Sequence, residues 1–178
     1  MYHDVLKFWF EEAGPSKWWL KDDAFDQLIF KRFSDIHSKA VRSELFEWRE
    51  SAKGRLAEII VIDQFSRNMF RGSPMAFAHD PMALVLAQES VSLGIDKLLT
   101  PEERGFLYLP FMHSESIKIH EVAEKLYRRH GVQSGLEWEM KHKAVIERFG
   151  RYPHRNEILS RKSSEEELSF LQQPNSRF

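Results

Sequence analysis

The sequence has no cysteine, no long apolar run and almost no net charge. Without cysteine the chain forms no disulfide, holds no metal through thiolates and offers no thiol nucleophile. With 26 Lys and Arg against 27 Asp and Glu, its formal charge of -1 gives no global attraction to nucleic acid or to an anionic membrane. No apolar run approaches the roughly 20 residues that span a bilayer, and residues 1–10 lack a signal-peptide pattern. We therefore expect a soluble, cytoplasmic protein that binds neither nucleic acid nor membranes.

Several motifs that identify enzymes are also missing. The sequence contains no Gly-rich phosphate loop, no dinucleotide fingerprint and no nucleophile elbow. Histidines and carboxylates are plentiful, but they show no His-Glu-x-x-His or other established ligand spacing. We therefore predict no metal and no cofactor, and the sequence leaves open whether the protein is an enzyme.

What the sequence does contain is enough apolar material for a core. Of its 178 residues 42% are hydrophobic, including 14 Phe and 5 Trp. This length is typical of one domain, and no linker-like segment divides the chain. We predict a single domain over residues 1–172, followed by a frayed tail over residues 173–178.

The apolar residues recur at spacings of three and four, which predicts helices almost throughout. Alternating strand patterns and Asn-Gly or Asp-Gly hairpin turns are absent. We expect an all-α fold of about nine helices packed as antiparallel pairs, without a visible internal repeat. The predicted helices cover residues 4–12, 22–37, 39–47, 54–70, 80–94, 100–109, 114–130, 134–149 and 163–171.

Local side-chain patterns predict where several of these helices begin and end. Pro110 is expected to interrupt the helix that follows Thr100, and Gly131 is expected to end the next one. Four starts are marked by a capping residue with a following proline or glutamate: Asp80 with Pro81, Thr100 with Glu103, Ser134 with Glu137 and Ser163 with Glu166.

The first of three unusually polar stretches covers residues 63–71. Asp63, Arg67 and Arg71 follow one another at four-residue spacing on one face of an otherwise apolar helix. An arginine at the end of such a helix can bind a carboxylate or phosphate through two parallel hydrogen bonds. The alternative is a structural ion pair, because a charged group in a core must be paired whether or not a ligand binds.

The second polar stretch is residues 110–115, in which His113 and Glu115 flank Ser114. In a loop or a first helical turn these two side chains can converge, as a general acid and base or as two metal ligands. The alternative is that Ser114 caps the following helix, Glu115 complements the helix dipole and His113 packs beneath it.

The third polar stretch, residues 149–156, combines glycine and proline with Arg151, His154, Arg155 and Asn156. Glycine permits a positive φ, and proline disfavours a helix at the residue before it, so a shaped loop is predicted. Residues 141–162 contain seven Lys and Arg against two Glu. This local excess favours an anionic ligand or an acidic neighbouring surface, and the alternative is a solvated basic face.

Together these stretches resemble the bacterial domain-of-unknown-function family 924. The resemblance covers essentially the whole chain and rests on four motifs: FWF at residues 8–10, IDQFSRNMFRG at 62–72, LPFMHSE at 109–115 and RFGRYPHRN at 148–156. It implies a helical domain similar to tetratricopeptide-repeat folds, but no established reaction, substrate or cofactor. Two positions depart from the family pattern: Ser160 replaces the usual glycine of Leu-Gly-Arg, and His120 replaces a common glutamine.

We expect the three polar stretches to meet in one pocket that binds a small anionic molecule, with arginines on its carboxylate or phosphate oxygens. If the pocket is catalytic, a histidine is the expected proton carrier, because histidine titrates near neutral pH. The predicted catalytic residues are His113, Glu115 and His154, and the predicted ligand-binding residues are Asp63, Arg67, Arg71, Arg151, Arg155 and Asn156.

Two alternatives stay open at this point. One is an interaction module whose helical groove captures a peptide or a protein. The other is a buried polar network that specifies the fold without binding a ligand. No sequence feature predicts the oligomeric state.

Overall fold

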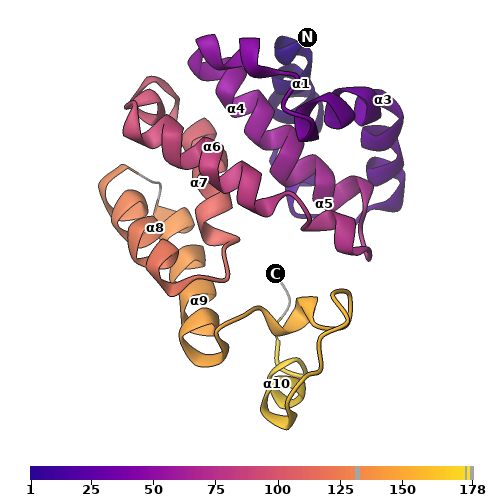
Figure 1. Ribbon diagram of the computed structural model, residues 1–178, viewed down its shortest axis with the longest axis vertical. Helices are drawn as coiled ribbons and strands as arrows, with labels where there is room; N and C mark the ends of the chain where they lie inside the picture. The colour runs from indigo at the N-terminus through magenta and orange to yellow at the C-terminus, as the bar shows by residue number, and fades with distance from the viewer. Residues whose placement is uncertain (131–132, 175, 177–178) are drawn as a thin grey trace.

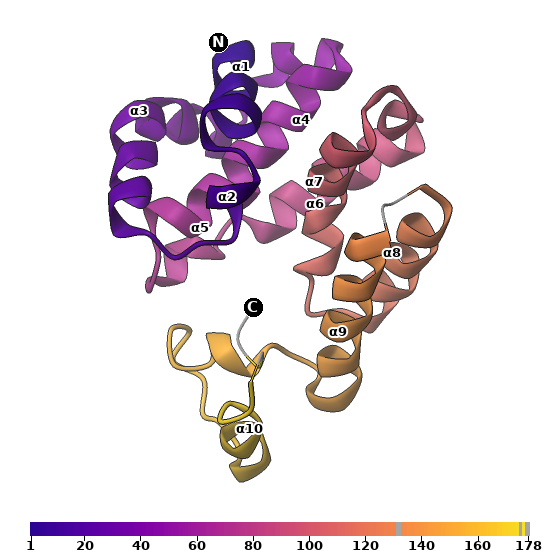
Figure 2. The same ribbon diagram turned by 180° about the vertical axis from the view of Figure 1, so that it is seen from behind.

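The computed structural model describes residues 1–130, 133–174 and 176 (Figures 1 and 2). These residues form helices, turns and loops and no strand, which confirms the predicted all-α fold. The α-helices are α1 (Tyr2–Leu6), α2 (Pro15–Trp18), α3 (Asp23–Val41), α4 (Ala52–Ile60), α5 (Ser66–Met69), α6 (Asp80–Ser92), α7 (Pro101–Met112), α8 (Ile117–His130), α9 (Gln133–Phe149) and α10 (Glu165–Phe170). Shorter π- or 3-10 segments are η1 (Lys7–Ala13), η2 (Phe46–Glu50), η3 (Val61–Phe65), η4 (Pro74–Ala76), η5 (Ile95–Leu98) and η6 (Pro153–Arg155).

One continuous helical stretch, made of α4, η3 and α5, lies at the centre of the protein. Residues 56–62 within it are all buried, as expected from their apolar sequence. The exception in polarity is Glu58, whose buried carboxylate accepts two hydrogen bonds from Arg49, at 2.7 and 2.6 Å. Because η3 is π-helical, the turn at Val61–Phe65 is wider than the turns around it, a feature that is frequent at functional sites.

The N-terminal helices pack on this central stretch through aromatic rings. The ring of Phe33 on α3 lies 5.0 Å from that of Phe8 and 5.0 Å from that of Phe65, measured between centroids. Trp9 adds an edge contact with Phe65 at 5.6 Å. Such aromatic pairs stabilise a core beyond their buried area. They fix α3 against the part of the helix that carries the polar residues.

The second half of the chain is a series of helices, each packed on its neighbour in sequence. α6 contacts α7, α7 contacts α8, and α8 contacts α9. Figures 1 and 2 show that consecutive helices in this series run in opposite directions, so these neighbours are antiparallel, as predicted. After α9 the chain turns back, and the segment with η6 and α10 lies below α5 in Figure 1. This return brings the third polar stretch to the central helix.

The predicted helix boundaries at residues 39 and 110 are wrong, and the helix predicted from residue 114 begins at Ile117. α3 runs unbroken to Val41, so no separate helix begins at residue 39. The buried Ala40 continues the inward face of α3, which explains the extension. α7 continues through Pro110 to Met112, although proline removes a backbone donor. Phe111 and Met112 are buried, and their packing offsets the lost hydrogen bond.

The predicted caps agree only in part with the structure. The capping box of Thr100 and Glu103 is confirmed. At α10 the box uses Ser164 and Glu167, one residue later than predicted, in a run where adjacent serines and glutamates offer both registers. Ser134 lies inside α9 and does not cap it, because the helix begins at Gln133. Gly131, predicted to end the preceding helix, lies outside the described residues.

No helix within the described part of the chain is long and apolar enough to cross a membrane. Of the tail predicted to be frayed, Ser176 is buried and its Oγ donates to the carbonyl of Leu171 at 3.2 Å, whereas residues 175, 177 and 178 lie outside the described residues. The division into one domain over residues 1–172 and a tail stays a prediction, as does the cytoplasmic location.

Candidate functional site

Asp80, the first residue of α6, is the centre of a group of charged side chains. Arg67 on α5 donates to both of its carboxylate oxygens, at 2.9 and 3.0 Å. The prediction that Asp80 caps α6 is wrong: His79 holds the cap position, and the carboxylate turns to the guanidinium instead. The bidentate pair gives the carboxylate two hydrogen bonds from a cation, whereas a cap would give it backbone N–H donors that carry no net charge, which explains the outcome.

Asp63 lies one turn before Arg67 and is almost fully buried, with its side chain 1% exposed. Arg67 Nη1 lies 3.2 Å from Asp63 Oδ1 and donates to the Asp63 carbonyl at 2.8 Å. The side-chain amide of Gln64 donates to the other carboxylate oxygen at 2.5 Å. The intrahelical pair inferred from the four-residue spacing is therefore present.

His113, at the end of α7, contacts the same carboxylate. Its Nδ1 lies 2.8 Å from Asp63 Oδ1. Burial first, and the charge of Arg67 second, lower the pKa of His113 despite the opposing effect of Asp63. Burial alone would raise the pKa of Asp63, but Arg67 and His113 outweigh it and hold that pKa below its usual value. At neutral pH the pair is therefore an ionised carboxylate and a neutral imidazole that donates from Nδ1.

Arg155 joins the group from the C-terminal loop. Its Nη1 donates to Asp80 Oδ2 at 3.2 Å, and its Nη2 donates to the His113 carbonyl at 3.0 Å. The guanidinium carbon lies 4.5 Å from the ring centroid of Phe77 and 4.7 Å from that of Tyr152. The buried Nε has no hydrogen-bond partner among the described residues. We call Asp63, Arg67, Asp80, His113 and Arg155 the Asp80 cluster.

Glu115 belongs to a neighbouring pair and not to the Asp80 cluster. Arg161 donates to its two oxygens at 2.6 and 2.9 Å, and the backbone N–H of Tyr152 donates at 2.7 Å. Burial opposes ionisation of Glu115, but these hydrogen bonds prevail and lower its pKa. Glu115 is thus an ionised anchor for the C-terminal loop.

Three of the predicted ligand-binding residues have protein partners elsewhere. Arg71 donates to both oxygens of Asp26, at 2.5 and 2.9 Å. Arg151 donates to both oxygens of Glu167, at 2.6 and 2.8 Å. The amide of Asn156 donates to Ser163 Oγ at 3.0 Å. These three side chains do not meet the Asp80 cluster in one pocket.

His154 and His120 lie beside Tyr152. Burial, with the charge of Arg155, lowers the pKa of His154 to about 3, so this side chain is neutral at physiological pH. His120, at the position where the family often has glutamine, is fully buried. Its Nδ1 lies 2.7 Å from Glu139 and its Nε2 lies 2.8 Å from the Ser114 carbonyl. His120 therefore connects residue 114 to Tyr152 and stabilises the C-terminal loop.

Sequence reasoning missed three participants. The sequence marked Asp80 only as a helix cap, gave no role to Phe77 and included Arg161 only in the Leu-Ser-Arg segment. A weak signal was present for Asp80, since it is the first carboxylate after the arginines of the second motif. No local pattern marks Arg161 as the partner of Glu115, which lies 46 residues earlier.

The described residues contain no group of three His, Asp or Glu side chains arranged to hold a metal ion. The contacts of the Asp80 cluster point to a different capability. Neutral His113 is oriented by an ionised carboxylate, which is how proton acceptors are positioned in many active sites. Two guanidinium groups lie next to it.

Comparison with other proteins gives a consistent assignment. The chain matches a family described as bacterial proteins of unknown function (DUF924) over residues 5–175. It is also similar to the solved structure of a protein of unknown function from Agrobacterium tumefaciens, with a TM-score of 0.91 and 42% sequence identity over 96% of each chain. Comparison with curated proteins gives no significant match. On the family match and this likeness together, the chain belongs to the bacterial DUF924 family.

Proposed function

We propose that the protein binds a small carboxylate or phosphate beside Arg155, and that His113 accepts or delivers a proton there. The observation that carries the proposal is the sharing of Asp80. Its Oδ2 accepts from Arg67 at 3.0 Å and from Arg155 at 3.2 Å, so within the described residues the carboxylate that Arg155 contacts directly is shared with a second arginine. By contrast, the guanidinium groups of Arg71 and Arg151 each donate hydrogen bonds to both oxygens of one carboxylate.

Two further properties of Arg155 support an anionic ligand. Burial, together with the like charge of Arg67, lowers its pKa, so its cation is less well stabilised than that of an ordinary arginine. Its buried Nε–H also has no acceptor among the described residues, and buried donors are seldom left unpaired. An anion next to Nε would supply both the missing charge and the missing acceptor.

His113 supports the proton-transfer part of the proposal. Because Nδ1 is committed to Asp63, the lone pair of a neutral ring is on Nε2, for which the described residues provide no hydrogen-bond partner. The side chain is 15% exposed, so the ring is not sealed from solvent. The nine predicted site residues thus reduce to four, Asp63, Arg67, His113 and Arg155, arranged around Asp80.

Titration with inorganic phosphate and with succinate, followed by thermal unfolding, tests the proposal. A ligand at 100 times its Kd stabilises the folded protein by about 2.7 kcal/mol, so the midpoint should rise with ligand concentration. Arg155→Gln should abolish the rise. Arg71→Gln is the matched control, because Arg71 is a paired arginine outside the Asp80 cluster, and it should leave the rise intact. An equal rise in both variants, or no rise in the unmodified protein, would contradict the proposal.

A further inference from the structure

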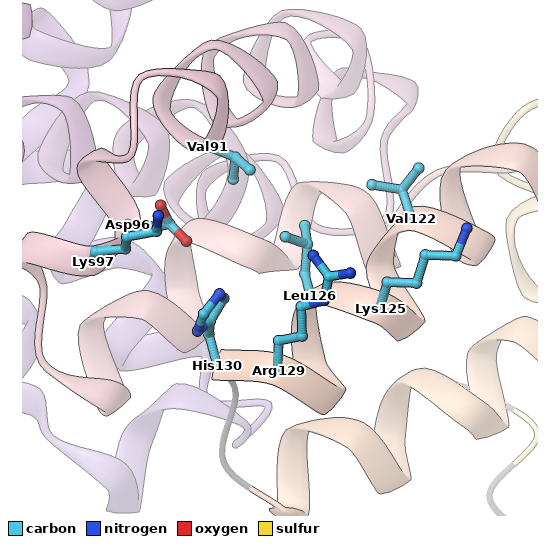
Figure 3. Close-up of a pocket in the computed structure, with 8 residues that line it drawn as sticks. All are labelled: Val91, Asp96, Lys97, Val122, Lys125, Leu126, Arg129 and His130. Atoms are coloured by element: carbon cyan, nitrogen blue, oxygen red, sulfur yellow. The ribbon is translucent and has the colours of Figure 1, made fainter.

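A second candidate site lies in a groove between α6, η5 and α8, away from the Asp80 cluster (Figure 3). The groove has a volume of about 310 Å³. This is the small end of the roughly 300–1,000 Å³ found for small-molecule sites. The lining residues are Val91, Asp96, Lys97, Val122, Lys125, Leu126, Arg129 and His130.

The apolar part of this groove comes from Val91 on α6 and from Val122 and Leu126 on α8. Figure 3 shows the three side chains directed toward the same space. Val122 is 41% exposed, so apolar surface remains in contact with water there. Covering it with an apolar group stabilises the bound state by about 25 cal/mol per Å².

Basic side chains surround that apolar surface. Lys97 comes from η5, and Lys125, Arg129 and His130 come from α8. None of the four forms an ion pair with a carboxylate in the described part of the chain, whereas the adjacent Arg128 pairs with Glu124 at 2.8 Å. The ammonium groups of Lys97 and Lys125 and the guanidinium of Arg129, next to this apolar surface, complement a ligand that has an anionic group and an apolar body.

Asp96 makes one end of the groove less favourable for an anion than the other. Its side chain is 2% exposed, and Oδ2 accepts a hydrogen bond from the Tyr108 hydroxyl at 2.6 Å. In Figure 3 it lies at the end of the groove opposite Lys125. A buried carboxylate repels another anion, so the anionic group of a ligand is expected at the end formed by Lys125 and Arg129.

We propose that this groove binds a small aliphatic carboxylate, with its chain on Val91, Val122 and Leu126 and its carboxylate on Lys125 and Arg129. The volume and the neighbouring cations favour a small amphipathic acid over a protein partner. The inference does not depend on the function proposed for the Asp80 cluster.

Calorimetric titration with octanoate tests this site, with acetate as the anion that lacks an apolar chain. Octanoate should bind saturably, acetate should bind at least about tenfold more weakly, and Arg129→Glu or Lys125→Glu should weaken octanoate binding by at least about tenfold. Arg128→Glu is the matched control, since it changes an exposed arginine that does not line the groove, and it should bind octanoate normally. All three positions are exposed, so the variants should stay folded, which thermal unfolding checks.

The remaining outcomes are equally decisive. Octanoate binding that persists in Arg155→Gln but is lost in Arg129→Glu would support the groove independently of the Asp80 cluster. Binding that is lost in Arg155→Gln and kept in Arg129→Glu would assign octanoate to the Asp80 cluster and overturn the inference. Equal binding of acetate and octanoate, absence of octanoate binding, or binding of acidic peptides alone would also overturn it.

Discussion

Arg155 in the C-terminal loop donates to Asp80 at the start of α6, 3.2 Å away and 75 residues earlier in the chain. This contact joins the returning end of the chain to the central helix, because Asp80 also binds Arg67. Among the described residues, Arg155 therefore shares its carboxylate partner with another arginine. One interaction therefore serves the fold and creates the charge imbalance on which the proposed anion site depends.

Asp63→Asn should lower the free energy of unfolding by about 3 kcal/mol, because it removes one partner from a buried, charged network. Arg67 and His113 would both lose the ionised oxygen that they now contact. Urea denaturation measures the change. Asp35→Asn on the exposed face of α3 is the control and should cost less than about 0.5 kcal/mol. A loss of the same small size at Asp63 would show that the pair is not stabilising.

Stability should fall as the pH drops below 6.5. Burial lowers the pKa of His37 to about 4 and those of His142 and His154 to about 3. Between these values and 6.5 the unfolded chain binds protons that the folded protein does not, so each histidine removes up to about 1.4 kcal/mol per pH unit. Glu139, whose pKa is raised by burial, opposes this trend only near and above its ordinary value of 4.5.

Urea denaturation from pH 7.5 to 5 tests this pH dependence. His142→Gln should reduce the slope, since glutamine does not titrate. A free energy of unfolding that stays constant between pH 6.5 and 5 would show that these three rings do not resist protonation in the folded protein.

Ser160→Gly should stabilise the protein by up to about 1 kcal/mol, because left-handed backbone is costly for a residue with a β-carbon. Ser160 has a φ of 54°, and the resemblance to family 924 implies a glycine at this position. The turn is therefore retained with a less suitable residue. Ser160→Ala keeps the β-carbon and should give no gain. Thermal unfolding compares the two, and equal midpoints would contradict the explanation.

Gly54→Ala should destabilise the protein by about 2–3 kcal/mol through a steric clash. A β-carbon at this position would lie 2.0 Å from the carbonyl oxygen of Trp48, so the backbone of η2 or α4 would have to move. Gly105→Ala in α7 is the opposite case. No atom of the described residues lies within 4 Å of its β-carbon position, and alanine there should stabilise the helix by about 0.5–1 kcal/mol. Chemical denaturation of both variants should therefore give changes of opposite sign.

Local sequence patterns determined the helices and part of their ends. Spacings of three and four predict the buried face of α3, and Thr100 with Glu103 predicts the start of α7, because both signals lie within one or two helical turns. The resemblance to family 924 followed from short motifs in the correct order. The same patterns singled out the polar stretches that contain Asp63, His113 and Arg155.

Only the tertiary structure decided which charges are paired. Arg71 contacts Asp26 and Arg161 contacts Glu115, in pairs 45 and 46 residues apart. A local pattern cannot choose among many carboxylates at such separations, since the choice depends on how the helices pack and how the chain returns after α9. For this reason the sequence marked polar residues but not their partners, and Arg71, Arg151 and Asn156 have contacts outside the Asp80 cluster. Packing also explains why α7 continues through Pro110. The buried contacts of α7 stabilise the helix by more than the low helix propensity of one proline destabilises it.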